Sequence, residues 1–100
     1  MSAADWIAAL DPAPPADLAK SMRAALPEST STPSAEDLLK AAEQLLERVL
    51  RSDCESRASA LDLLTVDALM THALLVASND PSSTDDFAQR ALARVTAAWQ

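Results

Sequence analysis

The stretch over residues 56–78 is the longest apolar run in the chain, and it constrains the fold more than any other segment. When it is projected as a helix at about 100° per residue, apolar side chains cover most of its circumference. One apolar face contains Leu61 and Leu75, and the other contains Leu63 and Met70. A helix that is apolar on nearly all sides is buried by several neighbours. The sequence therefore predicts that this helix is the largely buried centre of a bundle.

Two polar stripes separate the apolar faces of this helix. The first stripe contains Ser59, Asp62, Thr65 and His72, and the second contains Asp67, Thr71 and Ser78. A membrane-spanning helix needs about 20 predominantly apolar residues, and a carboxylate near the bilayer centre costs a few kcal/mol. The aspartates on the two stripes therefore favour the core helix of a soluble protein over a membrane span.

The composition indicates an all-α fold. The 100 residues include 22 alanines and 15 leucines but no glycine, and β-branched residues are few. Alanine and leucine are strong helix formers, whereas the common hairpin turns need residues at positive φ, usually glycine. A chain of this length forms one domain around one core. We therefore predict a single helical domain over residues 1–100, an antiparallel bundle of four to five helices around the helix at about 56–78.

Serines and prolines mark the expected helix boundaries. A serine followed three residues later by an acidic residue is typical of a helix start, and Asn79 suits a left-handed helix end. The serine–aspartate pairs are Ser2–Asp5, Ser34–Asp37 and Ser83–Asp86. We predict helices over 2–10, 15–26, 35–52, 56–78 and 83–98. The Pro/Ser/Thr segment 27–33 is expected to link an N-terminal helical pair (2–26) to a three-helix remainder (34–100).

The net charge of −7 argues against nucleic acid and membrane partners. Eight basic residues are scattered among fifteen acidic ones, whereas phosphate backbones and anionic lipid surfaces attract clustered Lys and Arg. In the predicted helix 35–52, Glu36 and Glu47 are expected to pair with Lys40 and Arg51 at i, i+4 spacing. The N-terminal segment lacks a basic stretch followed by an apolar run, so we predict no signal peptide and a cytoplasmic location.

The sequence offers little support for cofactor or metal chemistry. The single cysteine, Cys54, allows neither an internal disulfide nor a cysteine-based metal site, and the flanking Asp53 and Glu55 disfavour its thiolate. A phosphate-binding loop needs glycine, which the chain lacks. Di-metal bundles use Glu-x-x-His motifs on two helices, and this chain has one histidine. We therefore expect no cofactor and no resident metal.

The candidate ligand or interface residues are Asp67, Thr71, His72, Arg90 and Arg94. Asp67 and Thr71 are helical neighbours, so the threonine hydroxyl can hydrogen-bond to Asp67. Asp62 and His72 share a stripe but are ten residues, or about 15 Å, apart along the helix. They cannot bind one ion without ligands from elsewhere. The two arginines are expected to pair with Asp86, Asp62 or a partner's carboxylates.

These observations favour a non-catalytic protein. The frequent Ala, Leu, Arg and Asp suggest a bacterial genome rich in G and C. We predict a small acidic module for protein–protein interaction or self-association, with a homodimer burying one apolar face of the helix 56–78 across a two-fold axis. The alternative is a small-molecule-binding or enzymatic bundle with a pocket near Asp67, Thr71 and His72, for which a cavity of a few hundred Å³ is typical.

Overall fold

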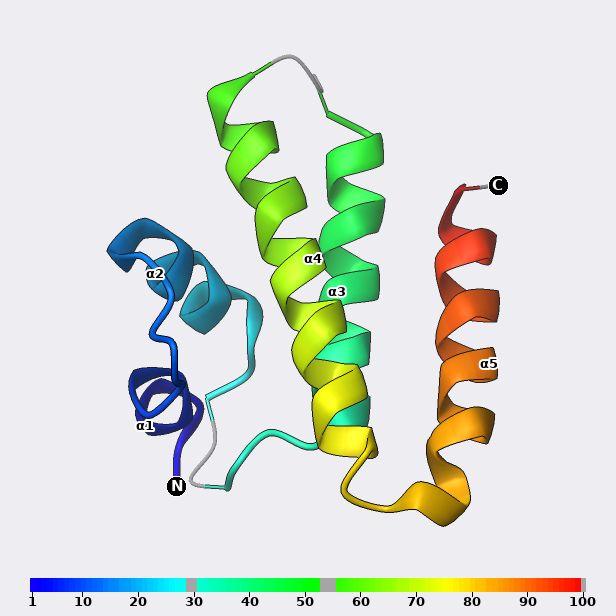
Figure 1. The fold of residues 1–100 in the computed structure, drawn as a ribbon. Coiled ribbons are helices and arrows are strands. Elements are labelled where there is room, and N and C mark those ends of the chain that lie inside the picture. Colours follow the sequence, from blue (N-terminus) through cyan, green and yellow to red (C-terminus); the bar gives the residue numbers. More distant parts are fainter. Residues whose placement is uncertain (29–30, 53–55, 100) are drawn as a thin grey trace.

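The computed structural model has five α-helices and, among the residues that it describes, no strand (Figure 1). The described residues are 1–28, 31–52 and 56–99. The helices are α1 (Ala3–Ala8), α2 (Ala16–Ala25), α3 (Ala35–Leu50), α4 (Arg57–Ala77) and α5 (Pro81–Trp99). The predicted all-α bundle is confirmed. Cys54, whose thiol was expected to be unreactive, lies outside the described residues.

The helices α3 and α4 form the central pair of the bundle. They run side by side in opposite directions along most of their lengths (Figure 1). The short helices α1 and α2 cover one flank of this pair, and α5 stands along the other flank. Helix α2 packs mainly on α4, whereas α5 packs on both α3 and α4. The central pair is therefore flanked on two sides by the remaining helices.

The hydrophobic core is one cluster to which all five helices contribute. Its largest buried members are Ile7, Leu18, Met22, Leu26, Leu38, Leu39, Leu45, Leu69 and Phe87. Helix α3 supplies more of them than any other helix, because its apolar residues, which include Ala42 and Val49, recur at spacings of three and four residues and so occupy one face. The N-terminal helical pair shares this core with the other helices.

Side-chain caps begin three of the helices, two of them at the expected serines Ser2 and Ser34. Ser34 starts α3 with a complete capping box, in which its Oγ accepts from the Asp37 amide at 3.1 Å and its own amide donates to Asp37 Oδ2 at 3.0 Å. Ser2 Oγ accepts from the Asp5 amide at 3.2 Å, and Ser56 Oγ caps α4. These caps satisfy amide groups that the first helical turn leaves without partners.

The junction between α4 and α5 differs from the prediction. No described residue has a positive φ, so Asn79 does not end α4 in the left-handed conformation; its amide instead donates to Val76 O at 3.2 Å in a tightened last turn. Helix α5 begins at Pro81 rather than Ser83, because proline favours the first helical position. Asp80 precedes it and accepts from the Ser82 amide and hydroxyl. Hydrogen bonds from Ser82 and Ser83 lower the pKa of the exposed Asp80 carboxyl.

The core-facing side of α4 lies between the two apolar faces that the sequence pattern indicated. It follows the line Thr65, Leu69 and Ala73, all of which are fully buried. The Thr65 hydroxyl lies 2.8 Å from both the Leu61 carbonyl and the Ser21 hydroxyl, so the buried polar group is satisfied. Burial of this one line leaves the opposite side of α4 uncovered, and the helix is less enclosed than expected.

Candidate functional site

Four leucines on the uncovered side of α4 are exposed. Leu63 is 43% exposed, Leu64 49%, Leu74 40% and Leu75 56%. The exposed residues of this side, which we name the α4 surface, are Ala60, Leu63, Leu64, Asp67, Thr71, Leu74 and Leu75. In Figure 1 the helix α4 lies in front of α3, between the N-terminal helices and α5.

The neighbouring helix α3 does not share this exposure. Leu38, Leu39, Leu45 and Leu46 of α3 are all at most 5% exposed. Its opposite face carries charged and amide side chains instead. The α4 surface is thus an apolar helix face without a neighbour, and such contiguous apolar surface marks interaction sites more often than scattered leucines do.

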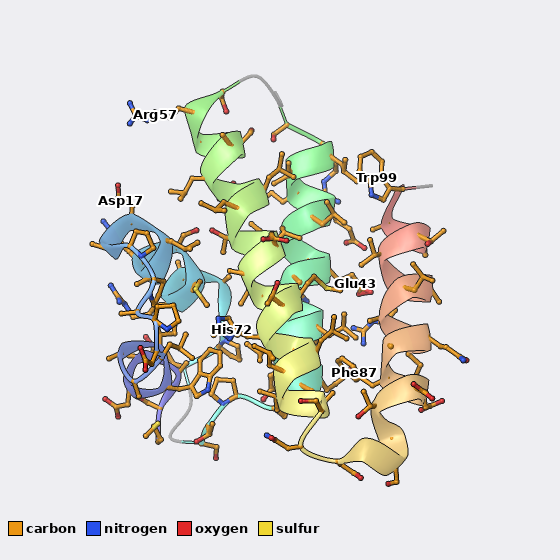
Figure 2. The ribbon with its side chains drawn as sticks, in the orientation of Figure 1. Asp17, Glu43, Arg57, His72, Phe87 and Trp99 are labelled. Atoms are coloured by element: carbon orange, nitrogen blue, oxygen red, sulfur yellow. The ribbon has the colours of Figure 1, made fainter. Side chains whose placement is uncertain are left out.

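The structure does not bring Asp67, Thr71 and His72 together. Asp67 and Thr71 are exposed on the α4 surface, and the structure shows no hydrogen bond between them. His72 is half-buried and points toward the N-terminal helices (Figure 2). Its ring meets the Trp6 ring edge-to-face, with centroids 5.5 Å apart and planes at 83°. His72 thereby joins α1 to α4, away from the two other residues.

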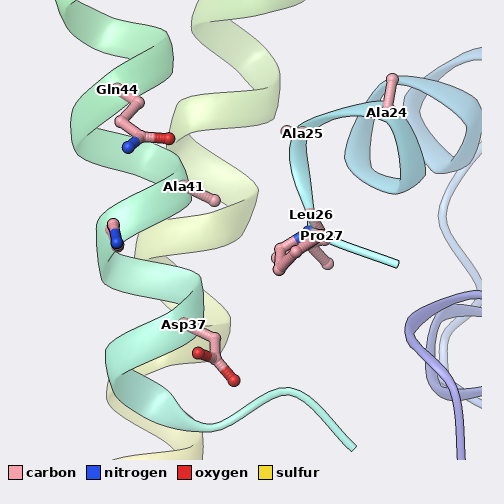
Figure 3. Close-up of a pocket in the computed structure, with 8 residues that line it drawn as sticks. Ala24, Ala25, Leu26, Pro27, Asp37, Ala41 and Gln44 are labelled. Atoms are coloured by element: carbon pink, nitrogen blue, oxygen red, sulfur yellow. The ribbon is translucent and has the colours of Figure 1, made fainter. Parts of the chain in front are cut away.

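The principal hollows among the described residues lie elsewhere. One of about 390 Å³ lies between the C-terminal end of α2 and α3, lined by Ala24, Ala25, Leu26, Ala41 and Gln44 among others (Figure 3). The nearby Asp37 carboxylate already accepts a hydrogen bond in the α3 capping box. Five of these hollows are lined by residues other than Asp67, Thr71 and His72.

A shallow groove of about 550 Å³ adjoins the N-terminal half of the α4 surface. It is lined by Asp17 of α2 and by Arg57, Ala58, Ala60, Leu61 and Leu64 of α4. Asp17 and Arg57 lie at its outer rim, where the start of α2 approaches the start of α4 (Figure 2). The groove thus combines an apolar floor with one acidic and one basic side chain.

The candidates Arg90 and Arg94 hold α5 against α3. Arg94 Nε donates to Glu43 Oε2 at 2.9 Å, and its Nη1 donates to Glu36. Arg90 lies 3.3 Å from Asp86 and 3.5 Å from Glu36. The hydrogen bonds to Glu43 and then Glu36 raise the pKa of the Arg94 guanidinium. Figure 2 shows Glu43 pointing from α3 toward α5.

This cluster replaces the local pairs expected within α3. Of the expected partners, Asp86 does pair with Arg90, whereas Asp62 lies 3.9 Å from Arg48 instead. The expected pairs of Glu36 with Lys40 and of Glu47 with Arg51 do not form between these described side chains. Glu36 faces α5, so two arginine guanidinium groups are within its reach. The candidate arginines therefore have a structural role in joining two helices.

Replacing Glu43 by Gln tests the strength of this cluster. We expect Glu43→Gln to lower the free energy of unfolding by about 1–2 kcal/mol, because it weakens a charge-assisted hydrogen bond between partly buried side chains. Urea denaturation followed by circular dichroism measures the change. Glu47→Gln is the matched control, since Glu47 lies exposed on the same helix; its effect should stay within about 0.5 kcal/mol. Equal effects of the two variants would show that the cluster does not stabilise the fold.

Helix α4 is also long and apolar enough, by length and composition, to cross a membrane, and it is the one such helix in the described ranges. The core helix of a soluble protein meets the same criterion. Asp67 interrupts the exposed side near its middle, where a bilayer would impose a cost of a few kcal/mol. A test of the α4 surface therefore needs a lipid control.

The described residues contain no group of three or more His, Cys, Asp or Glu side chains placed to hold a metal ion. Fold and surface together define a small, compact, all-helical globular protein with an uncovered apolar face on α4. No protein-family model, curated protein or solved structure matches the chain.

Proposed function

We propose that the protein is a non-catalytic cytoplasmic interaction module and that the α4 surface is its binding surface. The exposure of four leucines on a helix that also supplies the core carries this proposal. Burying a leucine contributes about 1.5–3 kcal/mol relative to leaving it in water. A partner that covers the α4 surface would therefore gain from each of the four side chains.

The shape and polarity of the α4 surface support a protein partner. Interfaces combine apolar anchors with polar groups, and here the leucine pairs flank the polar Asp67 and Thr71 at the middle of the surface. Arg57 and Asp17 lie beside the adjoining groove. A helical or extended segment with apolar anchors and matched polar groups fits this arrangement better than a small ligand, because the groove is open rather than enclosed.

Photocrosslinking in the living cells that express the protein tests whether the α4 surface binds another protein. A photoreactive phenylalanine analogue replaces Leu75 in one variant and Leu92 in another; Leu92 is the matched control, since it is 69% exposed but lies on α5. We expect protein adducts from position 75 that disappear when Leu64→Asp is added. Adducts of equal yield from both positions, or none from position 75, would contradict a binding role for the α4 surface. Recovery of the variant chiefly in the membrane fraction would indicate a lipid-facing surface instead.

A further inference from the structure

The exposed residues of α4 have the spacing of a helix–helix seam. Ala60, Leu64, Asp67, Thr71, Leu74 and Ser78 are all exposed and follow one another at intervals of four, three, four, three and four residues. This is the three-and-four spacing with which one helix packs against another, and Ala60, Leu64 and Leu74 are its apolar members. The 21 residues of α4 give such a seam a length of about 30 Å. The α4 surface is therefore suited to a second helix along its whole length.

The seam is symmetric about its own midpoint. The leucine pair 63–64 and the leucine pair 74–75 lie at equal distances from position 69. If a second α4 lies antiparallel across a two-fold axis at this position, Leu64 faces Leu74 of the second copy, and Leu63 and Leu75 flank this contact on opposite edges of the seam. A closed two-fold interface requires this kind of self-complementary surface. An arbitrary partner helix would not need it.

The polar residues at the middle of the seam also match each other in this arrangement. Asp67 of one chain faces Thr71 of the other, so a hydroxyl donor meets a carboxylate acceptor twice across the axis. A parallel arrangement would place Asp67 against Asp67, and like charges across an interface are unfavourable. Polar residues within a helix–helix seam can specify its register. The pairing of Asp67 with Thr71 thus favours the antiparallel arrangement of the two α4 helices.

Charges at the ends of the seam are complementary in the same register. Arg57, at the start of α4, is exposed and forms no ion pair with any described residue. In the antiparallel arrangement it lies near the end of the second α4, where the exposed Asp80 follows the helix. The C-terminal helix end also carries a partial negative charge. Each end of the seam therefore brings a cation to an acidic group.

The groove beside α2 provides space for the most exposed leucine of the α4 surface. Leu75 is 56% exposed, and in the antiparallel register it approaches the floor formed by Ala60, Leu61 and Leu64. The two-fold axis repeats this contact, so each chain supplies one projecting leucine and one groove. The contact is reciprocal, so the assembly is complete with two copies.

We propose that the occupant of the α4 surface is a second copy of the chain, bound antiparallel through α4 about a two-fold axis between Asp67 and Thr71. This inference rests on the proposed function, since it names the partner of the same surface. The symmetric leucine pairs, the central Asp–Thr pairs and the charges at the seam ends carry it.

Disulfide trapping tests both the partner and its orientation. In a Cys54→Ser background, Leu64→Cys and Leu74→Cys are combined, and the protein is oxidised and run on a non-reducing gel. Residues 64 and 74 lie about 15 Å apart within one helix, too far for an internal disulfide. We expect a covalent dimer from the double variant. Each single variant and Leu92→Cys should remain monomeric, whereas efficient trapping of either single variant would overturn the antiparallel register.

Sedimentation equilibrium of the native sequence gives an independent measurement. We expect a monomer–dimer equilibrium for the native sequence. Its dissociation constant should rise at least tenfold in Leu75→Asp and should stay within about twofold of the native value in Leu92→Asp. Circular dichroism confirms that both variants are folded. A strictly monomeric native protein at high micromolar concentration would overturn the inference. If position 75 then gave photoadducts with a different protein, the proposed function would stand and only the second copy would be excluded. The absence of all adducts would contradict both the proposed function and the dimer. Flotation of the protein with anionic or neutral lipid vesicles would also contradict both.

Discussion

Replacing Leu69 by Asp is expected to unfold the protein. Leu69 is fully buried on the core-facing line of α4, between two other buried residues. The substitution removes a large apolar side chain and places an unpaired carboxylate in the core, for a combined cost of about 5 kcal/mol or more. This cost is comparable with the total stability of a small domain, about 5–15 kcal/mol. Loss of the helical circular dichroism signal at 25 °C measures the effect.

The matched control for this variant lies on the same helix. Leu64→Asp introduces the same side chain on the α4 surface, where the leucine is already 49% exposed. At low micromolar concentration this variant should keep the helical signal and a cooperative melting transition, because an exposed carboxylate remains hydrated. If Leu69→Asp melted like the native protein, α4 would not supply the core as the structure indicates. Unfolding of both variants would instead contradict the exposure of the α4 surface.

Phe87→Ala is expected to release α5 from the bundle. Phe87 is 4% exposed, belongs to the common core and points from α5 toward α3 and α4 (Figure 2). Together with the smaller Ala91 it is the fully buried apolar anchor of α5. Truncating a buried phenylalanine costs about 3–5 kcal/mol, so the amides of α5 should exchange with solvent about 150- to 5,000-fold faster. Hydrogen exchange followed by mass spectrometry measures this change.

The comparison of α5 with α3 separates local release from global unfolding. In Phe87→Ala the amides of α5 should lose more protection than those of α3, whose leucines pack on α4 and α2. Leu92→Ala is the control on α5, since Leu92 is largely exposed. This substitution should change the free energy of unfolding by no more than about 0.5 kcal/mol. Unchanged protection of α5 in Phe87→Ala would show that the arginine cluster, rather than Phe87, holds the helix in place.

Features that depend on neighbours in the sequence could be predicted well. The all-α fold follows from composition, and the start of α3 follows from Ser34 and Asp37, whose two hydrogen bonds are present. The buried face of α3 follows from spacing, because residues three and four apart share one side of a helix. These features need no knowledge of how the helices pack.

Features that join distant segments could not be predicted. Glu36 was expected to pair with Lys40 four residues on, but it pairs with Arg90 and Arg94, which are 54 and 58 residues away. The packing of α5 along α3 decides this choice, and no local rule encodes it. The placement of His72 against Trp6 likewise depends on where α1 lies.

For the helix α4, the sequence determined an apolar circumference interrupted by two polar stripes, and hence a place at the centre of the bundle. It did not determine which side is covered, because periodicity treats the two apolar faces as equivalent. Only the tertiary structure placed the line of Thr65, Leu69 and Ala73 in the core. The other helices of a 100-residue chain cover the core-facing side and two flanks, so the side with Leu64 and Leu75 remains in water.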